Sequence, residues 1–201
     1  MDRAFPLHDE TTAPEAARPA LATTKQNFGM IPNLERVMAG APALLQAYCA
    51  AEELFESTSL SPIERQVVYQ TANFENECDY CVPWHTYLSA QAKMGAGDIE
   101  ALRNGSRLSG TKLEALRNFA RRLIHTRGKI SPNDLEDFIN AGYDDSQALE
   151  VVLGLAVKTM SNYTNSIAGT PLDTIMRKYS WRKPKIAMRH EENVPTLARV
   201  P

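Results

Sequence analysis

Residue patterns that typically begin α-helices occur at several points along this chain. A hydroxyl side chain stands ahead of proline, or three positions ahead of glutamate, in three segments: Ser61-Pro62-Ile63-Glu64, Thr111-Lys112-Leu113-Glu114 and Ser131-Pro132. In this pattern the hydroxyl oxygen accepts hydrogen bonds from the free N–H groups of a first helical turn, and proline is tolerated there because it needs no N–H. Apolar residues between these points recur at helical spacing, and no segment shows the alternation of a β-strand. The sequence therefore predicts an all-α fold, as one multi-helix domain.

The same spacing predicts where the helices and the ends of the domain lie. Helices are expected over about 41–56, from 61 to the region of the cysteines, from about 80 to 95, and over 111–127, 131–142, 145–168 and 172–179. In the longest of these, the residues expected to face the core are Leu149, Val152, Leu153, Ala156 and Ile167. We expect residues 1–25 to form an irregular arm, 26–181 the helical domain and 182–201 a basic tail.

Length and charge limit the possible partners. The 201 residues fit one domain, and 22 basic against 24 acidic residues give a net charge of −2, which favours neither a nucleic acid nor a membrane surface as partner. No apolar run approaches the ~20 residues that cross a bilayer. Residues 1–9 lack the apolar stretch of a secretory signal. We therefore expect a cytoplasmic protein.

Two cysteines and a histidine lie close together, in the segment Cys78-Asp79-Tyr80-Cys81-Val82-Pro83-Trp84-His85. Proline is tolerated only in the first turn of a helix, so Pro83 predicts a helix that begins near residue 80 and places Cys81 in its first turn. The positive end of the helix dipole favours a thiolate there. His85 follows one turn later on the same face, where an imidazole can accept the thiol proton, and Cys78 is near enough to form a disulfide with Cys81. The segment predicts a redox site.

Two other interpretations of this segment stay open. Cys78, Cys81 and His85 would supply three ligands to zinc, but no second cysteine or histidine pair has the spacing to complete such a site. The second interpretation is that both thiols are chemically inert. We expect no metal and no cofactor, and we expect Cys49, in an apolar helical run, to be a small buried residue.

The segment from Leu60, LSPIERQVVYQTANFENECDYCVPWHTYLSAQAKMG, resembles the core of the alkylhydroperoxidase D / carboxymuconolactone decarboxylase family. It is most similar to the peroxidase-related branch with the pattern Cys-x-x-Cys-x-x-x-His. Upstream, NFGMIPNLERVMAGAPALLQAY resembles the lead-in helix of that branch, and downstream SNYTNSIAGTPLD resembles the end of its last long helix. The resemblance covers about residues 27–181. It implies an AhpD-like helical domain that assembles as a homo-oligomer (dimer, trimer or hexamer).

The resemblance also implies roles for single residues. Cys81 would be the peroxidatic thiolate, Cys78 the resolving thiol and His85 the imidazole of a proton relay. The family has an acidic residue twelve positions before the first cysteine, where this chain has Gln66. A glutamine cannot take up a proton at neutral pH, although it can orient a water molecule. Glu77, on the same helical stripe, is a candidate substitute for the missing acid, and the alternative is that it is a solvated side chain near the helix end.

The function implied by the resemblance is that of a cysteine-based hydroperoxide reductase, re-reduced by a dithiol protein or a small thiol. Tyr80 and Trp84 are expected to line the approach of the hydroperoxide, although both are equally suited to packing between protomers. One alternative is a non-catalytic redox-sensing or assembly protein that uses the same thiols. Another is a lactone decarboxylase, as in the other branch of the family, but that chemistry does not need a dithiol.

Overall fold

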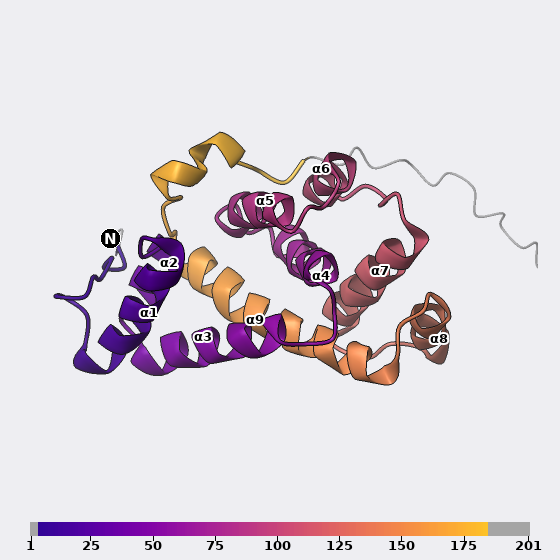
Figure 1. Ribbon diagram of the computed structural model, residues 1–201, viewed down its shortest axis with the longest axis horizontal. Coiled ribbons are helices and arrows are strands. Elements are labelled where there is room, and N and C mark those ends of the chain that lie inside the picture. The colour runs from indigo at the N-terminus through magenta and orange to yellow at the C-terminus, as the bar shows by residue number, and fades with distance from the viewer. Residues whose placement is uncertain (1–3, 185–201) are drawn as a thin grey trace, which may run out of the picture.

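The computed structural model describes residues 4–184, and this part of the chain consists of helices and loops without a strand (Figure 1). In chain order the elements are η1 (Glu15–Ala17), α1 (Arg18–Phe28), α2 (Asn33–Met38), α3 (Pro42–Glu56), α4 (Pro62–Glu75), α5 (Cys81–Gln91), α6 (Ala96–Asn104), α7 (Thr111–Thr126), α8 (Pro132–Asn140), α9 (Asp145–Ala168) and η2 (Thr174–Tyr179). The predicted all-α fold is thus confirmed. Within residues 4–184, no helix combines the length and apolar character needed to cross a membrane. Most of the expected basic tail, 185–201, lies outside the described residues.

Helix α4 runs through the middle of the molecule and packs against α5, α7 and α9 (Figure 1). It begins with the predicted capping box, in which Ser61 Oγ accepts from the Glu64 N–H and the Glu64 carboxylate accepts from the Ser61 N–H. Because neighbouring helices cover α4 on several sides, its polar residues Gln66, Gln70 and Asn73 are buried together with its apolar ones. A helix face that is polar in sequence therefore lies in the interior, which is where the site is built.

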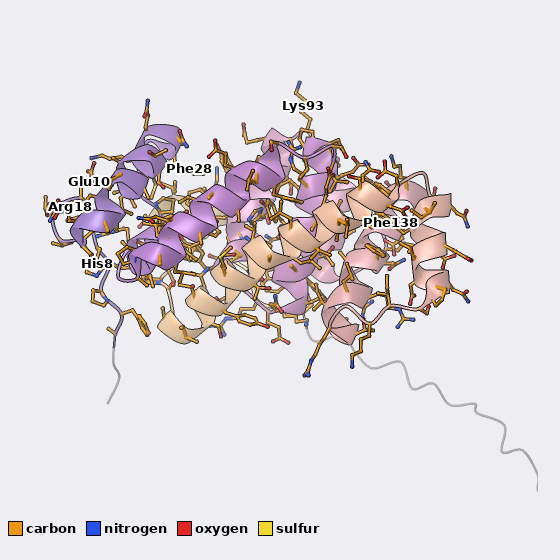
Figure 2. All side chains as sticks on the ribbon, turned by 90° about the horizontal axis from the view of Figure 1, so that it is seen from below. His8, Glu10, Arg18, Phe28, Lys93 and Phe138 are labelled. Atoms are coloured by element: carbon orange, nitrogen blue, oxygen red, sulfur yellow. The ribbon has the colours of Figure 1, made fainter. Side chains whose placement is uncertain are left out.

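Helix α9 has the predicted bounds but buries a different face from the one expected. It packs beside α3 along one side of the molecule (Figure 2) and also contacts α2, α4 and α7. The buried face carries Val151, Gly154, Val157, Lys158, Ser161, Asn162, Thr164 and Asn165. The expectation that Leu149, Val152, Ala156 and Ile167 face the core is wrong. Ala156 is exposed, and the exposed fractions of Leu149, Val152 and Ile167 are 72%, 50% and 72%. The interior contacts of α9 are made by small and polar side chains, and several of its large apolar side chains lie on the surface.

Two further local predictions need correction. Residues 1–25 were expected to form an irregular arm, but α1 begins at Arg18, since Pro19 lies in the first helical turn and Leu21 is fully buried against the core. Helix α7 begins at the predicted residue, but its N-cap is Gly110 and no side chain caps it. The expected capping-box residue Glu114 instead forms an ion pair with Arg117, at 2.8 Å.

Candidate active site

The two cysteines lie where α4 ends and α5 begins. The Cys78 N–H donates to the Asn73 carbonyl near the end of α4, and Glu77 has a left-handed φ of 55°, so the chain reverses direction within a few residues. Helix α5 then begins at Cys81, with Pro83 in its first turn as predicted. The Cys81 sulfur is therefore carried by the first residue of a helix, near its free N–H groups.

The fold brings the two sulfur atoms together as free thiols. The Cys81 N–H donates to Cys78 Sγ at 3.2 Å, and the Cys78 thiol donates to the Cys81 sulfur. Both side chains are buried, with exposed fractions of 5% for Cys78 and 2% for Cys81. The pair predicted from the sequence is therefore a direct contact in the structure.

Two side-chain amides from α9 point at the Cys81 sulfur. Asn162 Nδ2 donates to Cys81 Sγ at 3.1 Å, and Asn165 Nδ2 donates to the same sulfur at 3.2 Å. The Asn162 amide is held in place because its nitrogen also donates to Asn73 Oδ1 while its oxygen accepts from Asn76 Nδ2, both at 2.9 Å. Donors that are fixed in this way stabilise the charged form of a buried sulfur.

His85 lies in a hydrogen-bonded chain between α4 and α9. Its Nδ1 lies 2.9 Å from Gln66 Oε1, and its Nε2 lies 2.9 Å from Lys158 Nζ. Because the amide oxygen can only accept, Nδ1 carries the hydrogen, and Nε2 is left to accept from the Lys158 ammonium group. The predicted partners Gln66 and His85 are thus joined, but among the described residues neither sulfur is hydrogen-bonded to His85.

These contacts shift the ionisation of the two thiols in opposite directions. Burial alone would raise the pKa of Cys81, but the hydrogen bond from Cys78, the charge of Lys158 and the two amides outweigh it and lower that pKa below its ordinary value. The hydrogen bond to Cys81, together with burial, raises the pKa of Cys78. Burial and the charge of Lys158 lower the pKa of His85, so its imidazole is neutral. The site therefore favours one thiolate, at Cys81, beside one thiol.

The aromatic residues of the motif are fixed by an acid from the loop before η2. Tyr80 donates its hydroxyl hydrogen to Asp173 Oδ2, and Trp84 Nε1 donates to the same oxygen at 3.0 Å. The Leu34 N–H donates to the Tyr80 oxygen at 3.1 Å. Both rings are therefore held against the cysteine site, and their hydrogen-bonding groups are already engaged.

A small cavity of about 40 Å³ adjoins the Cys81 sulfur. Its walls are formed by Phe28, Pro32, Leu34, Glu35, Tyr48, Glu52, Tyr80, Cys81, Trp84, His85, Leu88 and Lys158. Since one water molecule needs roughly 10–15 Å³ of such space, the cavity accepts a peroxide group or a few water molecules. A wider groove of about 740 Å³ shares Phe28, Glu35, Glu52 and Leu88 with this cavity and has room for a larger substituent.

Several residues that matter at this site were not predicted from the sequence. Lys158 and the two asparagines of α9 lie far along the chain from the cysteines, and the only sequence signal for them is polar residues at helical spacing within an apolar helix. Glu35 and Glu52 carry no motif at all. Glu77, the candidate for the relay acid, is instead exposed and paired with Lys183 at 3.3 Å. It is therefore a solvated side chain near the helix end, which was the alternative expectation.

Two other expectations concern Cys49 and metal ions. Cys49 is half-buried and lines the wider groove, so it is less enclosed than expected. Within residues 4–184, no three side chains of histidine, cysteine, aspartate or glutamate come together as a set of metal ligands. The ammonium group of Lys158 faces the His85 nitrogen that a zinc ion would need, so the geometry does not favour the zinc interpretation.

Comparison with known proteins yields structural neighbours only, since no protein-family model and no curated protein sequence matches the chain. An uncharacterized peroxidase-related protein from Ralstonia eutropha JMP134, described as an alkylhydroperoxidase AhpD core, is similar with a TM-score of 0.76 and 18% identity over 86% of this chain and 93% of its own. A peroxidase-related protein from Silicibacter sp. TM1040 has a TM-score of 0.72 and 19% identity over 88% and 92% of the two chains.

A third neighbour is the debrominase Bmp8, whose cysteine-to-alanine variant was solved in complex with 2,3,4-tribromopyrrole. It has a TM-score of 0.72 and 15% identity, over 89% of this chain and 96% of its own. At these identities the likeness concerns the fold, and proteins of one fold differ in chemistry. The fold expected from the resemblance is confirmed: the chain folds as an alkylhydroperoxidase D core.

Proposed function

We propose that this protein is a cysteine-based hydroperoxide reductase with Cys81 as its nucleophile. The observation that carries the proposal is the environment of the Cys81 sulfur, which accepts from the Cys78 thiol and from the amides of Asn162 and Asn165, near the charge of Lys158. A thiolate is the reactive form of cysteine toward peroxides, so a site that stabilises it is suited to this reaction.

The reaction takes place in two steps. The Cys81 thiolate attacks one oxygen of the hydroperoxide, the O–O bond breaks, and the leaving oxygen takes up a proton to become an alcohol, while the sulfur becomes a sulfenic acid. The Cys78 sulfur then attacks the Cys81 sulfur, and the hydroxyl group leaves as water with the Cys78 proton. A dithiol protein or a small thiol reduces the resulting disulfide and is itself oxidised. The small cavity fits the peroxide group, and the wider groove fits its organic substituent.

The proposal is tested by mixing fully reduced protein with tert-butyl hydroperoxide in the absence of a reductant. We expect loss of two of the three thiols and formation of one tert-butanol per chain, with a Cys78–Cys81 disulfide found by peptide mass spectrometry. Cys81→Ser should abolish the reaction, while Cys49→Ser should still lose its two remaining thiols and form the same disulfide. If the thiol content of the unchanged protein stays constant, the proposal is wrong. Oxidation that occurs but is not followed by turnover with any thiol reductant would favour the redox-sensing alternative.

Reductive dehalogenation is a second candidate, favoured by the similarity of the fold to that of the debrominase and by the paired thiols. In this reaction the Cys81 thiolate takes up bromine from an aromatic ring, a proton replaces it on carbon, and Cys78 displaces bromide to leave a disulfide. The 40 Å³ cavity is small for a brominated ring, so we rank this second. Dehalogenation would become the first candidate if the reduced protein releases bromide from a bromopyrrole but loses no thiols when hydroperoxide is added.

We also propose that the partner of this protein is a second copy of itself. The exposed face of α9 carries Leu149, Val152, Tyr163 and Ile167, with exposed fractions of 72%, 50%, 59% and 72%. Leu54 of the neighbouring α3 is 60% exposed, and the two helices lie side by side on one face (Figure 2). Apolar surface of this kind on two adjacent helices is typical of an interface, which supports the expected homo-oligomer.

A further inference from the structure

The cavity beside Cys81 contains more acids than cations. Lys158 is the one lysine or arginine among its lining residues, and it faces three groups able to carry a negative charge, Cys81, Glu35 and Glu52. In a site of low dielectric constant one positive charge balances one negative charge, and further negative charges are strongly disfavoured. Because several hydrogen bonds stabilise the thiolate at Cys81, the more deeply buried of the two carboxyl groups, that of Glu35, is the one that remains protonated.

Glu35 is the better placed of the two carboxyl groups. It extends from α2, its exposed fraction is 6%, and its Oε2 atom is buried without a hydrogen-bond partner in the described part of the chain. Glu52, in contrast, accepts from the Tyr48 hydroxyl at 3.4 Å. Several titratable groups act on Glu35 from neighbouring elements or share its cavity. They are Tyr48 and Glu52 of α3, Tyr80 just before α5, Cys81 and His85 of α5, Lys158 of α9 and Asp173 before η2. Burial, followed by the charge of Glu52, raises the pKa of Glu35 to about 8.

The other polar groups at the site do not have a proton to give. The His85 Nδ1 hydrogen points to Gln66, and the imidazole is neutral. Tyr80 and Trp84 both donate to Asp173. Glu35 therefore presents the free acidic group of this cavity.

We propose that Glu35 is the catalytic acid that protonates the leaving oxygen when Cys81 attacks a hydroperoxide. This inference rests on the proposed hydroperoxide reductase function and replaces the acid that is missing at Gln66. In the step, the Cys81 sulfur forms a bond to the nearer oxygen, the O–O bond breaks, and the Glu35 proton moves to the departing oxygen, giving sulfenic acid, alcohol and a Glu35 carboxylate. After the disulfide has been reduced, the proton that Cys81 loses returns to Glu35, which restores both groups.

The test compares Glu35→Gln with the unchanged protein in single-turnover reactions at neutral pH or slightly below. Release of the alcohol or the carboxylic acid is followed by chemical quench. Two oxidants are used, tert-butyl hydroperoxide and a peroxybenzoic acid. An alkoxide is a poor leaving group that needs a proton, whereas a carboxylate leaves without one. We expect the variant to react about 10²-fold more slowly with tert-butyl hydroperoxide and only a few-fold more slowly with the peroxy acid. Glu136→Gln, at an exposed glutamate of α8 that lines neither the small cavity nor the wider groove, is the matched control and should change neither rate.

The pH profile separates an acid from a residue that merely supports the fold. With tert-butyl hydroperoxide, the rate of the unchanged protein should fall as the pH rises past about 8, where Glu35 loses its proton. Alkylation of Cys81 by iodoacetamide should not slow over this range, because iodide leaves without a proton. This comparison needs no variant, so it decides the matter even if Glu35→Gln does not fold.

Three outcomes contradict the inference. An alkaline fall in the alkylation rate that matches the fall with tert-butyl hydroperoxide would overturn it. An equal loss of rate on both oxidants in the variant would also overturn it and would indicate a structural role. Equal rates for Glu35→Gln and the unchanged protein would overturn it as well, while leaving the hydroperoxide reductase function intact. If the unchanged protein reacts with neither oxidant, the proposed hydroperoxide reductase function is itself wrong.

Discussion

Lys158 is a buried lysine whose surroundings explain why it is tolerated. Its exposed fraction is 2%, its Nζ donates to His85 at 2.9 Å, and it lies 5.1 Å from the centre of the Tyr69 ring. A neutral imidazole and an aromatic face together do not neutralise an ammonium group, and a buried charge is costly unless it is paired. The thiolate of Cys81 supplies the missing negative charge, so the lysine and the nucleophile stabilise each other.

Replacing this lysine tests that coupling. Lys158→Met keeps most of the side-chain volume but removes the charge, so we expect the pKa of Cys81 to rise by about 1–3 units, because an opposite charge favours the ionised form. The change is measured as the pH dependence of thiolate absorbance, with Cys81→Ala as the reference. Lys112→Met, at a half-exposed lysine paired with Glu64, serves as the control. An unchanged pKa in Lys158→Met would mean that the charge does not act on the sulfur.

Sequence spacing predicts part of this site well and the rest not at all. Cys78 and Cys81 could be paired because they are three residues apart at a helix start that Pro83 defines, and all the relevant forces are local. Lys158 and Asn162 come from a helix about eighty residues later, and their approach to the sulfur depends on how α9 packs on α4, which no local pattern encodes.

At the level of elements, the close packing of α9 depends on a glycine. A β-carbon added at Gly154 would lie 2.5 Å from the Cζ atom of Phe55 on α3 and 2.9 Å from a Cγ atom of Val68 on α4. The absence of a side chain at this position therefore lets three helices approach one another, and this approach brings the polar face of α9 to the cysteines.

Gly154→Ala should destabilise the fold, because the ring and the backbone must shift to admit the methyl group. We expect a loss of about 1–3 kcal/mol in the free energy of unfolding, measured by urea denaturation. Gly97→Ala in α6 is the matched control, since a β-carbon there meets no atom within 4 Å and alanine favours a helix. Equal stabilities for the Gly154→Ala variant and the unchanged protein would show that the contact is not tight.

Element boundaries were more predictable than element faces. The bounds of α9 and the capping box at Ser61 follow from turn and cap residues, whose effect is local. The buried face of α9 was mispredicted because Leu149 and Ile167 are apolar yet exposed, whereas Lys158 is charged yet buried. Apolar periodicity cannot distinguish a core from an intermolecular interface, and it cannot identify a polar interior.

At the scale of the whole molecule, the exposed face of α9 predicts association. Ile167→Glu places a charge in the apolar stripe, so we expect it to weaken self-association, seen as a lower mass in analytical ultracentrifugation at micromolar concentration. Ile175→Glu is the matched control, because Ile175 is 55% exposed but lies in η2. If the unchanged protein is a monomer at this concentration, the proposed interface is wrong.

The protonation of Glu35 predicts how the stability of the whole protein changes with pH. Its folded-state pKa of about 8 lies above the ordinary value of 4.5 for a glutamate, so between these values the folded state holds a proton that the unfolded state has lost. The free energy of unfolding should therefore fall as the pH rises from about 5 to 8, and Glu35→Gln should remove this part of the decline. The measurement is urea denaturation at several pH values, with Glu136→Gln as the control. Parallel curves for Glu35→Gln and the unchanged protein would contradict a protonated Glu35.

The most direct test of the account is a titration of Cys81 in the reduced protein. Labelling the cysteine β-carbons with carbon-13 gives three NMR signals, which are assigned with single Cys→Ser variants. We predict that the Cys81 signal titrates clearly below the value of about 8.5 that is ordinary for a free cysteine, while Cys78 and Cys49 titrate above it. A Cys81 pKa at or above 8.5 would contradict the claim that this fold stabilises a thiolate.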